Sequence, residues 1–153
     1  MRWLLLLGAA AIPAFASTLK AQNASEAIGL CNNENGIHSA ESQIKGCTSI
    51  VNAPRVSSGG LAIAFNNRGL AYERMGKHRR AILDYDQAVA LSPSDPRFLN
   101  NRCYARTIID DLSRALEDCD AALRLRPNDP TILDSRGFTY LKLGLLGRAV
   151  ADF

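Results

Sequence analysis

Four cysteines are the residues whose type and spacing are most suggestive of chemistry. Cys31 and Cys47 are sixteen residues apart, and so are Cys103 and Cys119. Neither pair has the CxxC spacing of a redox motif. A pair forms a disulfide in an oxidising compartment if its Cα atoms lie within about 7 Å, and otherwise packs as buried thiols. We predict the disulfides Cys31–Cys47 and Cys103–Cys119, with four buried free thiols as the alternative.

No other group of residues resembles an active site. His38 lies in an expected loop and His78 begins an expected helix, and neither has partners at metal-ligand spacing. The sequence contains no phosphate-cradling glycine loop and no serine elbow. Carboxylates such as Asp84 and Asp86 are interpreted as solvated or paired. We therefore predict a protein that is not an enzyme, with no catalytic residues, no cofactor and no metal.

Length and composition fit a single domain of ordinary size. Hydrophobic residues make up 47% of the 153 residues, which is enough for a core. The formal net charge is +3, and the lysines and arginines are interleaved with acidic residues. This pattern indicates a solvated surface, so no nucleic-acid partner is expected.

The chain begins with the pattern of a targeting segment. Arg2 precedes an apolar run from Trp3 to Ile12, and Ala14-Phe15-Ala16 forms a small-x-small cleavage site. We expect a signal peptide at residues 1–16, with Ala21 as the alternative end. An uncleaved anchor is the rival interpretation, but the run is short for the roughly 30 Å of hydrocarbon in a bilayer. The expected location is therefore periplasmic or secreted, an oxidising space, with no membrane attachment after cleavage.

A short stretch recurs every 34 residues in the rest of the chain. Its three copies are Asn66-Asn67-Arg68-Gly69-Leu70-Ala71-Tyr72, Asn100-Asn101-Arg102-Cys103-Tyr104-Ala105-Arg106 and Asp134-Ser135-Arg136-Gly137-Phe138-Thr139-Tyr140. A fixed period between 20 and 50 residues is the signature of a stacked repeat protein. The elements that position any functional residue are therefore repeats.

Each repeat is predicted to hold two helices separated by short turns. Gly76 suits a helix end, while Pro93 and Pro96 stop one helix and start the next. The repeats are 62–95, 96–129 and an incomplete 130–153. Their expected helices are Ala62–Met75, His78–Leu91, Arg97–Ile109, Leu112–Leu125, Thr131–Leu143 and Leu146–Phe153.

Residues 17–57 are interpreted as a segment that contains a degenerate repeat. Its cysteine pair has the same spacing as the second pair. The pair also occupies the matching places one repeat before the regular repeats begin, apart from a four-residue insertion in the linker. Coincidence of two spacings is the alternative. The expected helices are Ser25–Leu30 and Ser39–Val51, after a loose start at 17–23, and residues 58–61 are expected to be a linker.

Glycine and aromatic residues change together between repeats. Gly69 goes with Tyr85, and Gly137 goes with Phe153, whereas the middle repeat has the cysteine pair at both positions. We interpret glycine on the first helix as room for a ring on the second. Where both residues are small, two sulfurs fill the gap.

Arginines and aspartates also share columns. Arg68, Arg102 and Arg136 occupy one column and Asp84, Asp118 and Asp152 another. The two columns should face one another in an antiparallel hairpin, which predicts a repeated structural ion pair that mainly fixes register. A ligand-binding arginine ladder is the alternative.

These residues resemble the tetratricopeptide repeat, a helix–turn–helix of 34 residues. The matches are Gly69, Tyr72, Gly76, Ala81, Tyr85, Ala88, Pro93, Ala115, Ala122, Pro127, Gly137, Tyr140, Gly144, Ala149 and Phe153. The middle unit departs from the pattern at Cys103, Arg106 and Asp110-Asp111, so its helix packing is expected to differ. The resemblance implies an all-α fold whose hairpins stack in a right-handed superhelix, or α-solenoid.

The resemblance also implies an inner face, made by the first helix of each unit, that binds peptides or partner helices. Its expected residues are Asn66, Leu70, Glu73, Asn100, Asn101, Tyr104, Thr107, Asp134, Phe138 and Leu141. An apolar column flanked by amides suits a peptide with apolar anchors. Some family members bind a terminal carboxylate through lysine and asparagine. Only Asn101 is suitable here, so that activity is not expected.

The sequence therefore predicts a non-catalytic protein–protein interaction scaffold of the exported space. The alternative is that the chain is the repeat-bearing front of a larger protein whose remainder carries another activity, since Phe153 falls within an expected helix and repeat stacks normally have a polar cap. Two further alternatives are self-association through the last helix, and an apolar column covered by the N-terminal segment or by further repeats.

Overall fold

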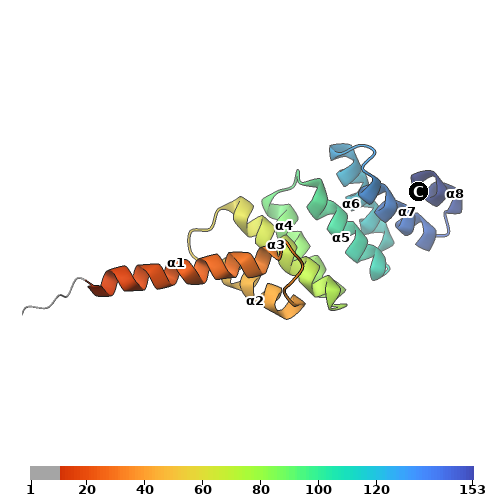
Figure 1. Cartoon of the computed structure of the whole chain (residues 1–153). Coiled ribbons are helices and arrows are strands. Elements are labelled where there is room, and N and C mark those ends of the chain that lie inside the picture. Colours follow the sequence, from red (N-terminus) through yellow and green to blue (C-terminus); the bar gives the residue numbers. More distant parts are fainter. Residues whose placement is uncertain (1–10) are drawn as a thin grey trace, which may run out of the picture.

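Eight α-helices follow one another along residues 11–153, which are the residues that the structure describes; side chains are described from residue 21 onward. This part of the computed structural model has no β-strand. Its helices pair as antiparallel hairpins, α1–α2 through α7–α8, which stack in order (Figure 1). The predicted all-α superhelix of stacked hairpins is confirmed. The helices are α1 Ala11–Asn32, α2 Ala40–Val51, α3 Ser58–Arg74, α4 His78–Leu91, α5 Pro96–Ile108, α6 Leu112–Leu125, α7 Pro130–Lys142 and α8 Leu146–Asp152.

Side-chain caps fix where the first helix of each regular hairpin begins. Asp95 accepts a hydrogen bond from the Arg97 amide ahead of α5, and Asp129 accepts one from Thr131 ahead of α7. Each is followed by a proline at the first helical position, which has no amide to satisfy. Ser57 caps α3 through the Gly60 amide. Residues 58–61, expected to be a linker, therefore form the first turn of α3, and the connection between hairpins ends at Ser57.

A left-handed residue closes the turn inside each regular hairpin. Gly76 and Gly144 have φ of +68° and +74°, and Asp110 takes the same conformation with φ of +64°. Glycine adopts this region without strain, and aspartate is among the few other residues that tolerate it. The Asp110-Asp111 departure therefore preserves the turn that glycine makes in the other two repeats, and the packing difference expected there does not arise at this turn.

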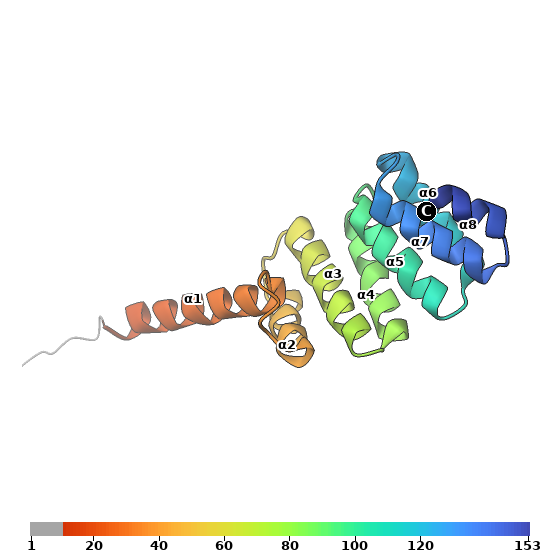
Figure 2. The same ribbon diagram turned by 45° about the vertical axis from the view of Figure 1, so that its right-hand side comes forward.

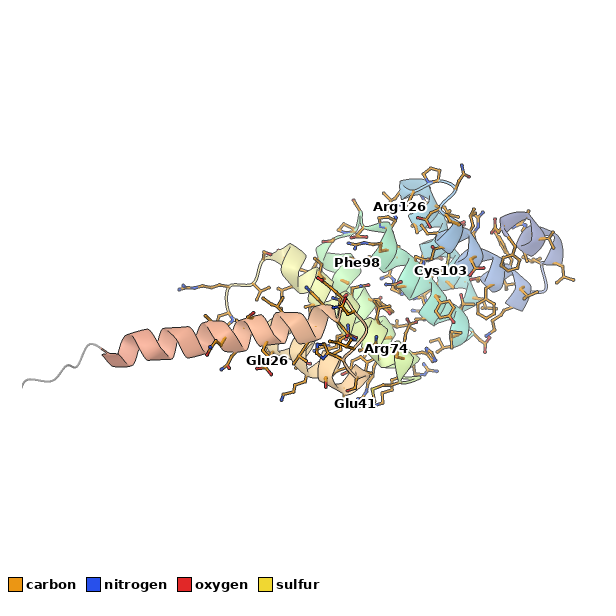
Figure 3. All side chains as sticks on the ribbon, in the orientation of Figure 1. Glu26, Glu41, Arg74, Phe98, Cys103 and Arg126 are labelled. Carbon is orange, nitrogen blue, oxygen red and sulfur yellow. A yellow bond between two sulfur atoms is a disulfide. The ribbon has the colours of Figure 1, made fainter. Side chains whose placement is uncertain are left out.

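The glycine and aromatic columns meet as the sequence predicts. A Cβ atom at Gly69 would lie 2.5 Å from Cε1 of Tyr85, and one at Gly137 would lie 2.6 Å from Cε1 of Phe153. In the middle hairpin the sulfurs of Cys103 and Cys119 lie at bonding distance instead, with Cα atoms 5.5 Å apart. Figure 3 labels Cys103 on α5. Cys31 and Cys47 are similarly placed, with Cα atoms 4.6 Å apart. Disulfide formation in the cell stays a prediction.

The arginine column joins hairpins as well as helices. Arg68, Arg102 and Arg136 each donate two hydrogen bonds to the aspartate of their own hairpin, with shortest distances of 2.7, 2.6 and 2.7 Å. The remaining Nη1 donates to the second helix of the preceding hairpin. It reaches Asp86 from Arg102 and Asp120 from Arg136, each at 2.8 Å. These contacts between hairpins were not predicted from the sequence.

A similar contact joins the α1–α2 hairpin to the first regular hairpin. Nη1 of Arg68 donates to Oγ1 of Thr48 on α2 at 3.1 Å. Thr48 precedes Asp86 by 38 residues, which is one repeat length plus the four-residue insertion. Gly46 lets α1 approach closely, since a Cβ there would lie 2.5 Å from Cβ of Leu30. The interpretation of residues 17–57 as a degenerate repeat stays a prediction.

Helix α1 is much longer than the expected Ser25–Leu30, and it includes the expected loose start at 17–23. The segment is rich in alanine, which has the highest helix propensity, and Pro13 falls in the first turn, where proline is tolerated. Its amino-terminal half projects away from the stack (Figure 2). The expected signal peptide lies outside the described residues at 1–10 and within α1 at 11–16. None of the described helices has the length and apolarity needed to cross a membrane.

Candidate functional site

Exposed apolar side chains lie along the first helices of the regular hairpins. Tyr104 on α5 is 42% exposed and Leu141 on α7 is 46% exposed. The ring of Tyr104 lies 6.2 Å from that of Phe138, and Leu70 on α3 and Phe138 are half-buried. We call the surface formed by these four residues the first-helix face. It presents an aromatic pair and two aliphatic side chains to solvent.

Asparagines border the first-helix face and connect its helices. Nδ2 of Asn101 on α5 donates to Oδ1 of Asn66 on α3 at 2.8 Å. Asn66 and Asn100 are only 8% and 7% exposed, so they are more deeply buried than expected for residues of a binding face. Oδ1 of Asn100 is buried and has no hydrogen-bond partner among the described residues. An unpaired buried carbonyl is costly, and because this oxygen has almost no accessible surface it does not contact a partner in this conformation.

Thr107, which was expected on the binding face, is fully buried. Its hydroxyl lies 2.7 Å from that of Thr139 on α7, and each hydroxyl is also within hydrogen-bond distance of a carbonyl one turn earlier on its own helix. The two hydroxyls pair α5 with α7 inside the stack. Thr107 therefore packs the helices together and cannot touch a partner in this conformation.

Two carboxylates on the first helices differ in their surroundings. Asp134 is exposed. Glu73 is largely buried, its Oε2 accepts a hydrogen bond from the Tyr85 hydroxyl at 2.9 Å, and its Oε1 has no partner among the described residues. Burial raises the pKa of Glu73 above its ordinary value, and the hydrogen bond from Tyr85 opposes that rise.

The arginines are occupied by aspartates. Arg106, which replaces the tyrosine of the other repeats, binds Asp118 at 2.7 Å and Asp86 at 3.3 Å. It adds a second guanidinium to the pair made by Arg102 and Asp118. The side chain of Asp118 is only 5% exposed. The structural interpretation of the arginine column is therefore supported over the ligand-binding one.

Similar proteins show the family to which these hairpins belong. The family described as Tetratricopeptide repeat matches residues 62–95. The second TPR of Spaghetti (RPAP3), bound to the HSP90 peptide SRMEEVD, is 30% identical to this chain, with 60% of this chain and 85% of that one covered and a TM-score of 0.57. The chain belongs to the tetratricopeptide repeat family.

Two other solved structures extend the comparison. The second TPR domain of human RPAP3, in complex with the HSP70 peptide SGPTIEEVD, is also 30% identical, covering 60% of this chain and 76% of that one with a TM-score of 0.56. MamA has a higher TM-score of 0.74 and covers 93% of this chain and 82% of its own, but its 21% identity shows the fold alone. No curated protein sequence matches the chain.

One residue of the tetratricopeptide repeat surface was missed by sequence reasoning. Lys142, at the end of α7, donates to the Thr107 carbonyl at 3.0 Å and pairs with Asp110 at 2.6 Å. Its position directly after Leu141 was the only available signal. Because the ammonium is engaged by α5, it is not a free cation beside the first-helix face. Among the described residues, no group of three or more His, Cys, Asp or Glu is arranged to hold a metal ion.

The burial of Glu73 leads to a prediction about how the stability of the fold depends on pH. Because its pKa is raised in the folded state, ionised Glu73 destabilises the fold, and this cost appears as pH rises above the ordinary value of 4.5. Glu73→Gln keeps an acceptor for Tyr85 and removes the charge. In urea denaturation, the variant should match wild type near pH 4 and become the more stable protein toward pH 7. Glu117→Gln, on the exposed face of α6, controls for the lost charge, and a Glu73→Gln effect independent of pH would contradict this account.

Proposed function

We propose that this tetratricopeptide repeat chain is a non-catalytic scaffold that binds a peptide or a partner helix on the first-helix face. The observation that carries the proposal is the exposed pair of Tyr104 and Phe138, with Leu141 one turn further along α7. Aromatic side chains offer large contact areas at low entropic cost, and exposed groups of them mark interaction sites. The RPAP3 domains, which are 30% identical, are bound to HSP90 and HSP70 peptides.

The chemistry of the face indicates the kind of segment that it binds. Its apolar side chains suit apolar anchors, and the half-buried side-chain amide of Asn101 beside them suits a main-chain group of a peptide. Asp134 is an exposed carboxylate beside the face and Glu73 is a largely buried one, while Lys142 is engaged by the Thr107 carbonyl of α5 and by Asp110. Acidic peptides such as those in the RPAP3 complexes would meet repulsion here. The favoured partner is a neutral or basic segment with apolar anchors.

We further propose that the mature protein acts in an exported space, periplasmic or secreted. The leader pattern at residues 1–16 and two cysteine pairs at bonding distance support this location. Cleavage at either expected site would also leave the stack intact. Ala27 is the first residue of α1 that is partly buried, among those whose side chains are described.

The binding proposal is tested by removing the aromatic pair. A Tyr104→Ala plus Phe138→Ala variant should lose capture of its partners from the exported fraction, because its main apolar anchors are gone. Leu83→Ala, a 65% exposed apolar residue on α4, is the matched control and should keep them. Mass spectrometry of captured proteins is the measurement, and an unchanged partner set in the double variant would refute the proposed surface.

The proposed location is tested on the same exported protein. Intact-mass and N-terminal analysis without reductant should give a chain beginning at residue 17 or 22, with no free thiols. Each bridge closes a loop of about 15 residues and should contribute roughly 3 kcal/mol, which reduction would remove from the free energy of unfolding. A full-length chain with four free thiols would contradict both the export and the disulfides.

A further inference from the structure

A cavity of about 500 Å³ lies where the degenerate repeat meets the first regular repeat. Its walls come from α1, from the end of α2 and the connection that follows it, and from the start of α3, and they are almost wholly apolar. The residues that matter here are Ala27, Ile28, Ile50, Ala53, Ile63 and Ala64. Small-molecule and side-chain pockets of proteins fall in the range of about 300–1,000 Å³. The cavity is therefore large enough for one or more bulky side chains.

The repeat register explains why this space is empty. At the second boundary Phe98 is 2% exposed and packs with Phe65 and Leu91. At the third boundary Ile132 is 3% exposed and packs with Leu99, whereas Leu125 is 46% exposed. At the first boundary all three are alanine. Ile50 replaces the alanine of the other repeats and compensates only in part. The replaced sets are Ala27 for Phe65 and Leu99, Ala53 for Leu91 and Leu125, and Ala64 for Phe98 and Ile132.

The mouth of the cavity continues the first-helix face. Ile28 and Ile63, at its rim, are 50% and 45% exposed and lie on the first helices α1 and α3. Ile28 precedes Asn66 by 38 residues, so the register places it in the column that borders the first-helix face. A chain that lies along α3 and α5 therefore has a direct path to the cavity.

We infer that the cavity receives a bulky apolar side chain, aromatic or branched, from the same partner segment that docks on the first-helix face. The inference rests on the proposed function. Large apolar side chains pack in the equivalent space at the two regular boundaries, so groups of this kind match the size and character of the cavity walls. The lining contains no lysine, arginine or histidine to hold the carboxylate of a fatty acid, whereas Asn23 and Asn32 at the cavity offer amides to a main chain.

The test uses N-acetyl-phenylalaninamide as the probe of the cavity. Titrated into ¹⁵N-labelled protein, it should shift the amide resonances of Ile28, Ile63 and Ala64 in a saturable way. Ala27→Phe and Ala53→Leu restore the side chains of the regular repeats, so each should weaken this binding about tenfold or abolish it. Ala90→Phe, on the exposed surface of α4, adds a ring outside the cavity and should bind like wild type.

Several results would overturn the inference. Absence of saturable shifts, or equal shifts in Ala27→Phe, would show that the side chain binds elsewhere. A lower Tm in both filling variants would show that the space is not free. Saturation by decanoate without any response to the amide would assign the cavity to an acyl chain. Partner capture that survives Ala27→Phe but not Tyr104→Ala plus Phe138→Ala would reject the cavity while leaving the proposed function intact.

Discussion

The contact on which the rest of the structure depends is the arginine that joins each hairpin to the one before it. In every regular repeat the guanidinium binds an aspartate of its own hairpin and a side chain on the preceding second helix. The side chains of the aspartates in the same hairpin, which are Asp84, Asp118 and Asp152, are 5–8% exposed. Buried charges tolerate few alternative geometries, because an unpaired one is strongly destabilising. The contact therefore sets the phase of the stack.

Because the hairpins stack in a fixed phase, each position at which the repeats differ can be compared with its equivalents. Cysteines replace a glycine and a ring in the middle hairpin, and Asp110 adopts the left-handed conformation of Gly76 and Gly144. Neither change moves the helices out of register, so the aromatic pair on α5 and α7 stays on one surface. Three alanines at the first boundary change the packing instead, and a cavity opens beside the same surface. The register of the hairpins therefore positions both the aromatic pair and the cavity beside it.

The sequence correctly predicted the helices whose bounds are set by the repeat period and by turn residues. The bounds of α4 and α6 agree with the prediction, because glycine, proline and aspartate mark their ends. Helix α1 was underestimated, because alanine-rich residues were assigned to a leader and a loose start. The start of α3 was missed, because two glycines were taken as a linker although Ser57 caps them. Helix propensity and capping overrode composition in both segments.

The repeat period did not predict how deeply each residue of the candidate site is buried. Thr107 shares a column with Glu73 and Leu141, yet it is fully buried, because Thr139 on the next helix pairs with its hydroxyl. The cavity was also invisible in the sequence, since small residues at helix contacts normally indicate close approach. Whether alanines bring helices together or leave a space depends on the packing of three elements at once.

The most direct measurement is the stability of Thr48→Asp compared with Ser49→Asp. Thr48 occupies the column of Asp86 and Asp120, so an aspartate there should pair with Arg68 and complete the series. Ser49 is exposed and one residue further along the same helix, so it carries the same cost of a negative charge near a helix C-terminus. The account predicts that Thr48→Asp unfolds with a free energy higher by about 1 kcal/mol than Ser49→Asp. Equal stabilities, or the reverse order, would contradict a single stack in common phase.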